Sequence, residues 1–150
     1  MKRRAQFSEA YLWRVQLPAR QTSLNRLLDR FEVLGRTLRL PVGLRRDLHL
    51  VLDEIVSNVV HSNHKTRAAR VGLELTLDRG AVTLEIIDNG KPFDPTLVRP
   101  PRGSILDRPI GGLGIHLVQG LMDTMVYSRQ HGSNHLVMTR AARRKDSRRV

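Results

Sequence analysis

The chain has 150 residues, of which 40% are apolar, so it is long enough for one packed domain and too apolar for a disordered chain. It has no cysteine, which excludes disulfides and thiolate metal sites, and no apolar run near the roughly 20 residues that span a bilayer. The net charge is +12, but residues 1–4 hold three basic groups, and residues 140–150 hold six basic groups and one acid. Residues 5–139 hold 17 basic and 13 acidic groups, a net charge of only +4.

This charge distribution predicts one central domain with two basic tails. We place the tails at residues 1–9 and 141–150 and the domain at residues 10–140. Solvated tails that aid solubility are the first interpretation, and contact with nucleic-acid phosphates or an acidic partner is the alternative. Aromatic residues make up only 4% of the chain, which leaves few platforms for stacked bases, so we do not expect direct nucleic-acid binding. Because no signal-peptide core follows the basic N-terminus, we expect a cytoplasmic protein without membrane attachment.

The first two predicted elements are a strand and a helix. Residues 10–17 alternate loosely between two faces, as in an edge strand, and Pro18 ends the pattern. Thr22 or Ser23 can cap the helix that follows. Gly35 lies inside this helix, where glycine costs about 1 kcal/mol relative to alanine. The apolar stripe of the helix comprises Leu24, Leu27, Leu28, Phe31, Leu34 and Leu38.

A second helix is predicted after a break at residues 41–43, and its pattern ends near His61. Glu54 and Asn58 are four residues apart and therefore share a face of this helix. A carboxylate that can accept a proton and an amide oxygen that can bind a hard cation then point the same way. The alternative for Glu54 is an ordinary solvent-facing glutamate. The helix has a single buried stripe with i, i+3, i+4, i+7 spacing, formed by Leu44, Leu48, Val51, Leu52, Ile55, Val56 and Val59.

Two alternating strands, at residues 71–77 and 82–88, flank a turn at residues 78–80 and predict an antiparallel hairpin. The second strand ends at Asp88, and Gly90 follows two residues later. Because glycine lets the backbone turn tightly, the carboxylate at this strand end can face a pocket. There it can accept hydrogen bonds from the exocyclic amine of a base such as adenine. An ordinary Asp-Asn-Gly turn is the alternative.

The span of residues 91–110 has no periodicity and contains five prolines and four basic residues. Loops of this length are uncommon in compact domains and are usually functional, often as lids. Residues 111–114, with the sequence Gly-Gly-Leu-Gly, then open a short apolar helix that runs to Met122. Glycines at a helix N-terminus leave amide N–H groups accessible to phosphate, and a flexible lid hinge is the alternative. The segment matches neither the P-loop nor the dinucleotide fingerprint.

A final hairpin is predicted from residues 124–130 and 134–140 around a turn at Gly132-Ser133. The strands therefore come as antiparallel hairpins with helices before and between them, and no internal repeat or second domain is visible. The predicted fold class is an α+β two-layer sandwich, with a mostly antiparallel mixed sheet and its helices on one face.

Three of these segments, taken together, resemble known sequence motifs. Glu54-x-x-x-Asn58, Asp88-x-Gly90 and Gly112-Leu113-Gly114 resemble, in order and spacing, the N, G1 and G2 boxes of the gyrase/Hsp90/histidine-kinase/MutL (GHKL) ATPase superfamily. Within it, the chain is similar to the small anti-sigma-factor serine/threonine kinases. The similar segments are residues 57–61 (Ser-Asn-Val-Val-His), 92–95 (Pro-Phe-Asp-Pro), 111–118 and the hairpin Gly132-Ser133-Asn134. The resemblance covers roughly residues 10–140 and implies the Bergerat ATP-binding fold.

The resemblance also implies ATP and Mg²⁺ as cofactors and a role for each box. Asn58 would coordinate Mg²⁺, and Glu54 would act as the general base toward a serine or threonine hydroxyl. Asp88 would bind the adenine amino group, with Gly90 providing the turn. Phosphate would be held by the backbone and helix N-terminus of the G2 box, at Gly112, Leu113 and Gly114. These roles agree with the shared face of Glu54 and Asn58, because phosphoryl transfer depends mainly on positioning and charge neutralisation.

The chain departs from the superfamily pattern at several positions. Pro92 stands where the larger superfamily has a second G1 glycine, and no later lysine-bearing box is clear. His61 and His64 have the spacing of a metal-binding pair, but no third ligand is evident, and a structural role is preferred for His61. Candidate γ-phosphate contacts, with solvated loop charges as the alternative, are Lys91, Arg99, Arg102 and Arg108.

The function implied by the resemblance is an ATP-dependent serine/threonine protein kinase and anti-sigma-type regulator. It would bind and phosphorylate an anti-anti-sigma antagonist of the STAS type and, in addition or instead, sequester a sigma factor. The kinases it resembles are typically homodimers. One alternative is an ATP-gated binding module without catalysis. Another is a detached histidine-kinase catalytic domain, although the chain lacks a helix pair with a phosphoacceptor histidine.

Overall fold

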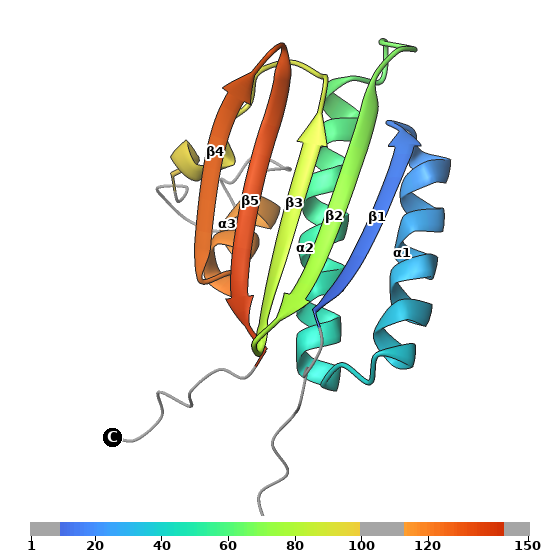
Figure 1. Ribbon diagram of the computed structural model, residues 1–150. Coiled ribbons are helices and arrows are strands. Elements are labelled where there is room, and N and C mark those ends of the chain that lie inside the picture. The colour runs from blue at the N-terminus through green and yellow to red at the C-terminus, as the bar shows by residue number, and fades with distance from the viewer. Residues whose placement is uncertain (1–9, 100–112, 143–150) are drawn as a thin grey trace, which may run out of the picture.

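The computed structural model describes residues 10–99 and 113–142, as five strands, three α-helices and one 3-10 helix (Figure 1). No helix among these residues is both long and apolar enough to cross a membrane. In chain order the elements are β1 (Tyr11–Pro18), α1 (Gln21–Thr37), α2 (Val42–Ser62), β2 (Arg70–Asp78), β3 (Ala81–Asp88), the 3-10 helix η1 (Pro95–Leu97), α3 (Leu113–Leu121), β4 (Thr124–Gln130) and β5 (Ser133–Ala141).

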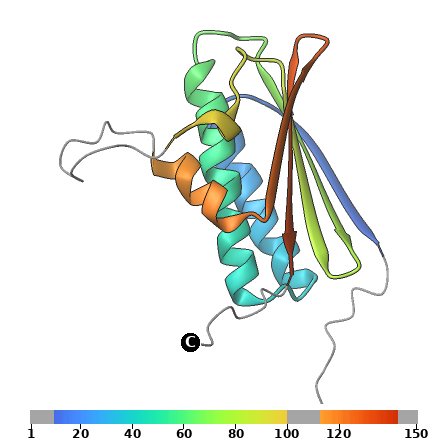
Figure 2. The same ribbon diagram turned by 90° about the vertical axis from the view of Figure 1, so that its left-hand side faces the viewer.

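The strands form one sheet in the order β1-β2-β3-β5-β4, and all four pairings in the described part of the chain are antiparallel. The three helices lie on the same face of this sheet, as the edge-on view in Figure 2 shows. The predicted α+β two-layer sandwich with helices on one face is therefore confirmed. β3 lies in the centre of the sheet, so the end that carries Asp88 lies between β2 and β5.

The core lies between the sheet and the helices, because alternate strand residues point toward the helix layer. Burial of one large apolar side chain contributes roughly 1.5–3 kcal/mol, so this face holds the two layers together. The largest side chains with almost no exposed surface are Leu24, Leu27, Phe31, Leu48, Leu52, Leu75, Leu77, Leu84, Ile86 and Met138. The inward positions of β5 also include two polar residues, Asn134 and Arg140, which are 5% and 6% exposed.

Several details of the predicted elements differ from the structure, and one is that α2 begins at Val42, inside the break predicted at residues 41–43. α1 begins at Gln21, and its N-cap residue Arg20 makes no side-chain cap, so the predicted cap at Thr22 or Ser23 is wrong. The Ala19 N–H donates a hydrogen bond to the Ala69 carbonyl at 2.9 Å, just after β1 ends. This contact redirects the chain there, so the helix begins before the predicted cap residues.

The last hairpin turns at His131-Gly132, one residue before the predicted Gly132-Ser133. Both turn residues have positive φ, of 48° and 77°. The turn between β2 and β3 has the same form, with φ of 48° at Arg79 and 78° at Gly80. Two-residue turns of this form match the twist of the flanking strands, but they require positive φ at both turn residues. Because glycine adopts positive φ readily, each turn contains one.

Candidate functional site

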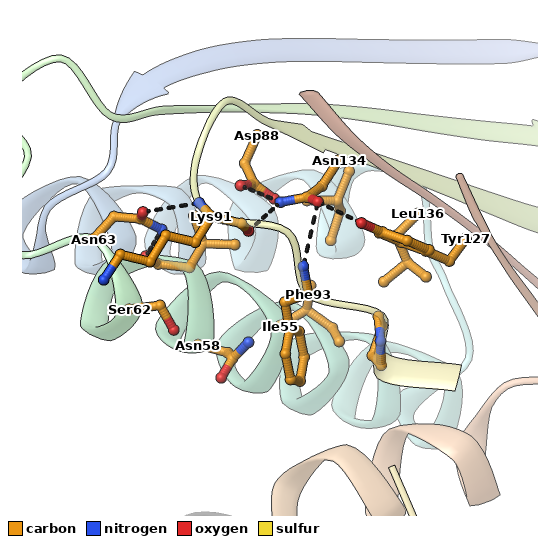
Figure 3. A pocket seen from close by; sticks show the side chains of 13 residues that line it. Ile55, Asn58, Ser62, Asn63, Asp88, Lys91, Phe93, Tyr127, Asn134 and Leu136 are labelled. Atoms are coloured by element: carbon orange, nitrogen blue, oxygen red, sulfur yellow. Dashed lines mark hydrogen bonds between the residues drawn. The ribbon is translucent and has the colours of Figure 1, made fainter. Parts of the chain in front are cut away.

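A cavity lies where α2 faces the end of β3 and the β4–β5 hairpin (Figure 3). About 420 Å³ of space that no atom fills lies between its lining residues, and part of this space is open solvent. Apolar walls combined with a few polar groups suit a flat heterocyclic ligand that carries polar groups along its edge. The lining residues are Ile55, Asn58, Val59, Ser62, Asn63, Ile86, Asp88, Lys91, Phe93, Pro95, Tyr127, Asn134 and Leu136.

The N-box residues on α2 lie at the cavity and next to it. Asn58 lines the cavity and is half-buried. Glu54, one turn earlier, is also half-buried but does not line it. Its carboxylate lies against Gly114, so closely that a methyl group at Gly114 would collide with it. The structure therefore brings the first predicted segment into contact with the third, while the first and second share a cavity.

Asp88, the last residue of β3, is buried in the cavity wall and is only 7% exposed. Its Oδ1 accepts hydrogen bonds from the Gly90 N–H at 2.9 Å and from Asn134 Nδ2 at 3.0 Å. Oδ2 accepts no hydrogen bond from the residues that the structure describes. Because an ionised carboxylate can only accept hydrogen bonds, this free oxygen suits an amino group and disfavours a carbonyl oxygen.

Gly90 is required for a reason other than the one predicted from the sequence. Its backbone is not in the left-handed region, so a tight turn alone does not demand glycine here. A methyl group at this position would instead collide with the side-chain amide of Asn63. That amide is buried, donates from Nδ2 to the Val59 carbonyl at 2.9 Å and accepts from the Lys91 N–H at 3.2 Å. Asn63 thus joins the end of α2 to the segment after β3.

Asn134 connects the β4–β5 hairpin to the same segment. Its side-chain amide contacts Asp88 and the backbone after β3, and it lies opposite Asp88 in the strand register. Tyr127 lines the cavity and donates its hydroxyl to Asn134 Oδ1 at 2.6 Å. The polar wall of the cavity is therefore built from three adjacent strands.

Sequence reasoning gave no role in the site to Asn63, Asn134 or Tyr127. For Asn134 a signal existed, because it has the same parity as the buried residues Leu136 and Met138. A polar residue at an inward strand position needs a buried partner. Asn63 directly follows α2, and nothing in its local pattern distinguishes it from a surface asparagine.

The third predicted segment is described in part. Leu113 is the first residue of α3 and is 53% exposed, and Gly114 follows it. Gly112 and Gly111 lie outside the described residues, as do Arg102 and Arg108. Lys91 lines the cavity, and Arg99 is exposed.

The described residues contain no group of three or more His, Cys, Asp or Glu side chains that could hold a metal ion. His64 Nδ1 lies 2.8 Å from the His61 carbonyl oxygen, and His61 Nδ1 lies 3.4 Å from Ser57 Oγ, so both rings contact groups near the end of α2. Asn58 offers a neutral oxygen in the cavity. Mg²⁺ typically takes few protein ligands and is completed by water and substrate phosphates, so this donor fits a nucleotide-bound Mg²⁺.

Comparison with known sequences gives a family and a relative. Residues 17–140 match the histidine kinase-like ATPase domain family. The serine/threonine-protein kinase BtrW of Bordetella bronchiseptica is 38% identical over 99 residues, which are 64% of this chain and 70% of BtrW.

Two solved structures share the fold. The RsbU and RsbW domains of Rv1364c from Mycobacterium tuberculosis align with a TM-score of 0.62 at 13% identity, over 87% of this chain and 32% of that chain. The nucleotide-free catalytic domain of the histidine kinase ThkA aligns with a TM-score of 0.51 at 12% identity, over 87% of this chain and 97% of that domain. At such identities these structures support the fold alone. The family match spans most of the sequence, from the last two residues of β1 to all but the last residue of β5, and the chain therefore belongs to the histidine kinase-like ATPase domain family.

Proposed function

We propose that the chain is an ATP-dependent serine/threonine protein kinase and an anti-sigma-type regulator. It binds and phosphorylates an anti-anti-sigma antagonist of the STAS type, sequesters a sigma factor, or does both. The observation that carries the proposal is the shared cavity of Asn58 and Asp88, with Glu54 one turn away and in contact with Gly114. The kinase relative BtrW supports the same class of reaction.

The base of ATP would occupy the cavity at the end of β3. Asp88 Oδ2 would accept a hydrogen bond from the adenine 6-amino group. GTP carries a carbonyl oxygen at the same position, and two acceptors facing each other are unfavourable. Phe93 and Tyr127 line the cavity with Ile55, which supports apolar contact with the ring.

The phosphates would extend toward the contact between Glu54 and the beginning of α3. A helix N-terminus has N–H groups without helical partners and a dipole that favours anions, so it suits phosphate. Mg²⁺, when bound through Asn58, would neutralise charge on the phosphates. The residues proposed to hold phosphate through the backbone are Gly112, Leu113 and Gly114.

The proposed reaction transfers the γ-phosphoryl group to a serine or threonine hydroxyl. The hydroxyl oxygen forms a bond to the γ-phosphorus, the bond from that phosphorus to the β–γ bridging oxygen breaks, and ADP leaves. Glu54 accepts the hydroxyl proton. General acid–base catalysis of this kind contributes roughly 10²–10⁴-fold to the rate.

Phosphate transfer from radioactive ATP to a cognate antagonist tests the proposal. Glu54→Gln should keep ATP binding and lower the transfer rate by about 10²–10⁴-fold, because the amide cannot accept the proton. Asp53→Asn is the matched control, since it removes a carboxylate from the neighbouring position of α2 and does not line the cavity. Its transfer rate should stay near that of the wild type.

Two outcomes would contradict the proposal in different ways. A wild-type protein that binds ATP but transfers no phosphate to its antagonist is not a kinase. A Glu54→Gln variant with full regulatory effect indicates an ATP-gated binding module, in which catalysis is not the function.

The partners and assembly state belong to the same proposal. A homodimer follows from the resemblance to anti-sigma kinases, and light scattering on the purified protein measures it. Both proposed partners act on transcription, so the protein would work in the cytoplasm. Capture of a small STAS-domain protein or a sigma factor from native cells, in a manner that depends on ATP, would support this assignment.

A further inference from the structure

The β4–β5 hairpin supplies a polar network to the end of β3. Asp88 pairs with Asn134 in the register of β3 and β5, and Asn134 pairs with Arg129 in that of β5 and β4. These three residues therefore form one row across adjacent strands. Asn134 is in the middle of the row and is only 5% exposed.

The side-chain amide of Asn134 is fully used within the protein. Its Oδ1 accepts from the Tyr127 hydroxyl at 2.6 Å, from the Arg129 guanidinium at 2.9 Å and from the Phe93 N–H at 3.4 Å. With three donors at the oxygen, the NH₂ group must face the other way. It donates to Asp88 Oδ1 at 3.0 Å and to the Lys91 carbonyl at 2.8 Å (Figure 3).

This arrangement fixes which oxygen of Asp88 is available. Asn134 and the Gly90 N–H occupy Oδ1, so Oδ2 is left to face a ligand. Asn134 itself keeps no free donor, and its oxygen already accepts three hydrogen bonds. It therefore makes no hydrogen bond of its own to the base. Arg129 also donates to the Gly90 carbonyl at 2.8 Å, and the hairpin thereby holds the backbone after Asp88 as well.

We propose that Asn134, held in one orientation by Tyr127 and Arg129, is the positioning residue that sets the base selectivity of this site. The inference rests on the proposed ATP-binding function and deepens it. Asp88 Oδ2 accepts a hydrogen bond from the 6-amino group, and Asn134 keeps that oxygen in place. Without Asn134 the Asp88 carboxylate rotates, and its hydrogen bond to the 6-amino group weakens. The difference in affinity between adenine and a base without that group then becomes smaller.

The test measures dissociation constants of ATP and of purine riboside triphosphate, which lacks only the 6-amino group. The ratio of the two constants reports the contact with that group. The wild type should prefer ATP by roughly tenfold or more, as expected for one hydrogen bond to a charged acceptor. Asn134→Ala should bring the ratio close to one. A purely structural role of Asn134 would weaken both nucleotides equally and leave the ratio unchanged, which would overturn the inference.

A second variant keeps the test decisive if Asn134→Ala does not fold. Tyr127→Phe removes one donor to Asn134 Oδ1 and keeps the ring in the cavity wall, and combining it with Arg129→Met removes two. The ratio should fall by about two- to fivefold for the single change and further for the double change. Ser128→Ala is the matched control, because Ser128 lies between them on β4 and its Oγ accepts only from Gln130 at 3.0 Å among the described contacts. An unchanged ratio in the double variant would also overturn the inference.

These measurements separate the inference from the proposed function. If the wild type binds neither nucleotide, the ATP-binding function fails. If the wild type prefers ATP and the Asn134 and Tyr127 variants keep that preference, the ATP site stands and the role of Asn134 is wrong.

Discussion

Gly114 is constrained by the neighbouring Glu54 side chain rather than by its own backbone. It lies in the first turn of α3, outside the positive-φ region, where alanine would be the better helix former by about 1 kcal/mol. A methyl group there would meet the Glu54 carboxylate. The glycine is therefore explained by close packing of a carboxylate on the beginning of a helix, which is favourable because the helix dipole attracts negative charge.

Gly114→Ala should impair phosphate transfer more than it impairs stability. The new methyl group must displace the Glu54 carboxylate, and a displacement of about 1 Å at a reacting group can lower a rate by about 10²-fold. Gly43→Ala in the first turn of α2 is the control, because its methyl group would meet no atom of the described residues within 4 Å. Transfer assays and thermal melts of both variants check this. Transfer at the wild-type rate by Gly114→Ala would show that the contact is not part of the working site.

At the scale of elements, the end of α2 and the segment after β3 are joined through one side chain. Asn63 bonds the Val59 carbonyl within the helix and the Lys91 N–H across the gap, and Gly90 leaves room for its amide. A buried amide with both ends paired stabilises this connection, whereas an unpaired end would cost about 1–3 kcal/mol.

A double-mutant cycle tests this connection. Gly90→Ala should destabilise the protein by about 1–3 kcal/mol, because the added methyl group overpacks against Asn63. In an Asn63→Ala background the collision is gone, so the same change should cost much less. Urea unfolding of the four proteins should give a coupling energy of about 0.5–3 kcal/mol. Additive effects would mean that Gly90 and Asn63 do not constrain each other.

The elements themselves follow from the sequence, because each depends on a local pattern. The alternation in β2 and β3 and the stripe of α2 predict the buried faces that are observed. Cap and contact details depend on partners that are distant in sequence. The bond between Ala19 and Ala69 decides where α1 begins, and Asn134 meets Asp88 across 46 positions. Spacing within a segment carries no information about such pairs.

The same limit applies to the candidate site. Asn58 and Asp88 were predicted as site residues, and both line one cavity, but their roles stay predictions. Glu54 lies beside the cavity rather than in its wall, next to Gly114. The chain does bend at Gly90, but the φ of this residue is not positive, and the close contact that constrains it comes from Asn63 on another element.

At the scale of the whole molecule, an ion pair between the buried Arg140 and the half-buried Asp47 joins the two layers. Arg140, on β5, donates from a guanidinium nitrogen to Asp47 Oδ2 of α2 at 2.6 Å. The Arg140 side chain is 7% exposed and that of Asp47 24%, and Arg140 Nε has no partner among the described residues. A charge in such a position depends strongly on its one counter-ion.

Asp47→Ala should lower the free energy of unfolding by about 3 kcal/mol, because it leaves the Arg140 charge buried and unpaired. The exposed pair of Arg14 and Glu74 provides the control, since their side chains are 69% and 33% exposed. Glu74→Ala should cost at most about 1 kcal/mol. Urea unfolding measures both. Equal small losses would mean that water reaches Arg140 and replaces its partner.

The alternation of β5 has a further consequence for how folding and ligand binding are related. Asn134, Leu136 and Met138 all point toward the helices, and a shift of one residue in strand pairing would turn all of them outward. A mispaired sheet would then expose its apolar core side chains and, at the same time, lose the contact between Asn134 and Asp88. Under the proposed function, nucleotide binding therefore depends on correct alignment of β5 in the sheet.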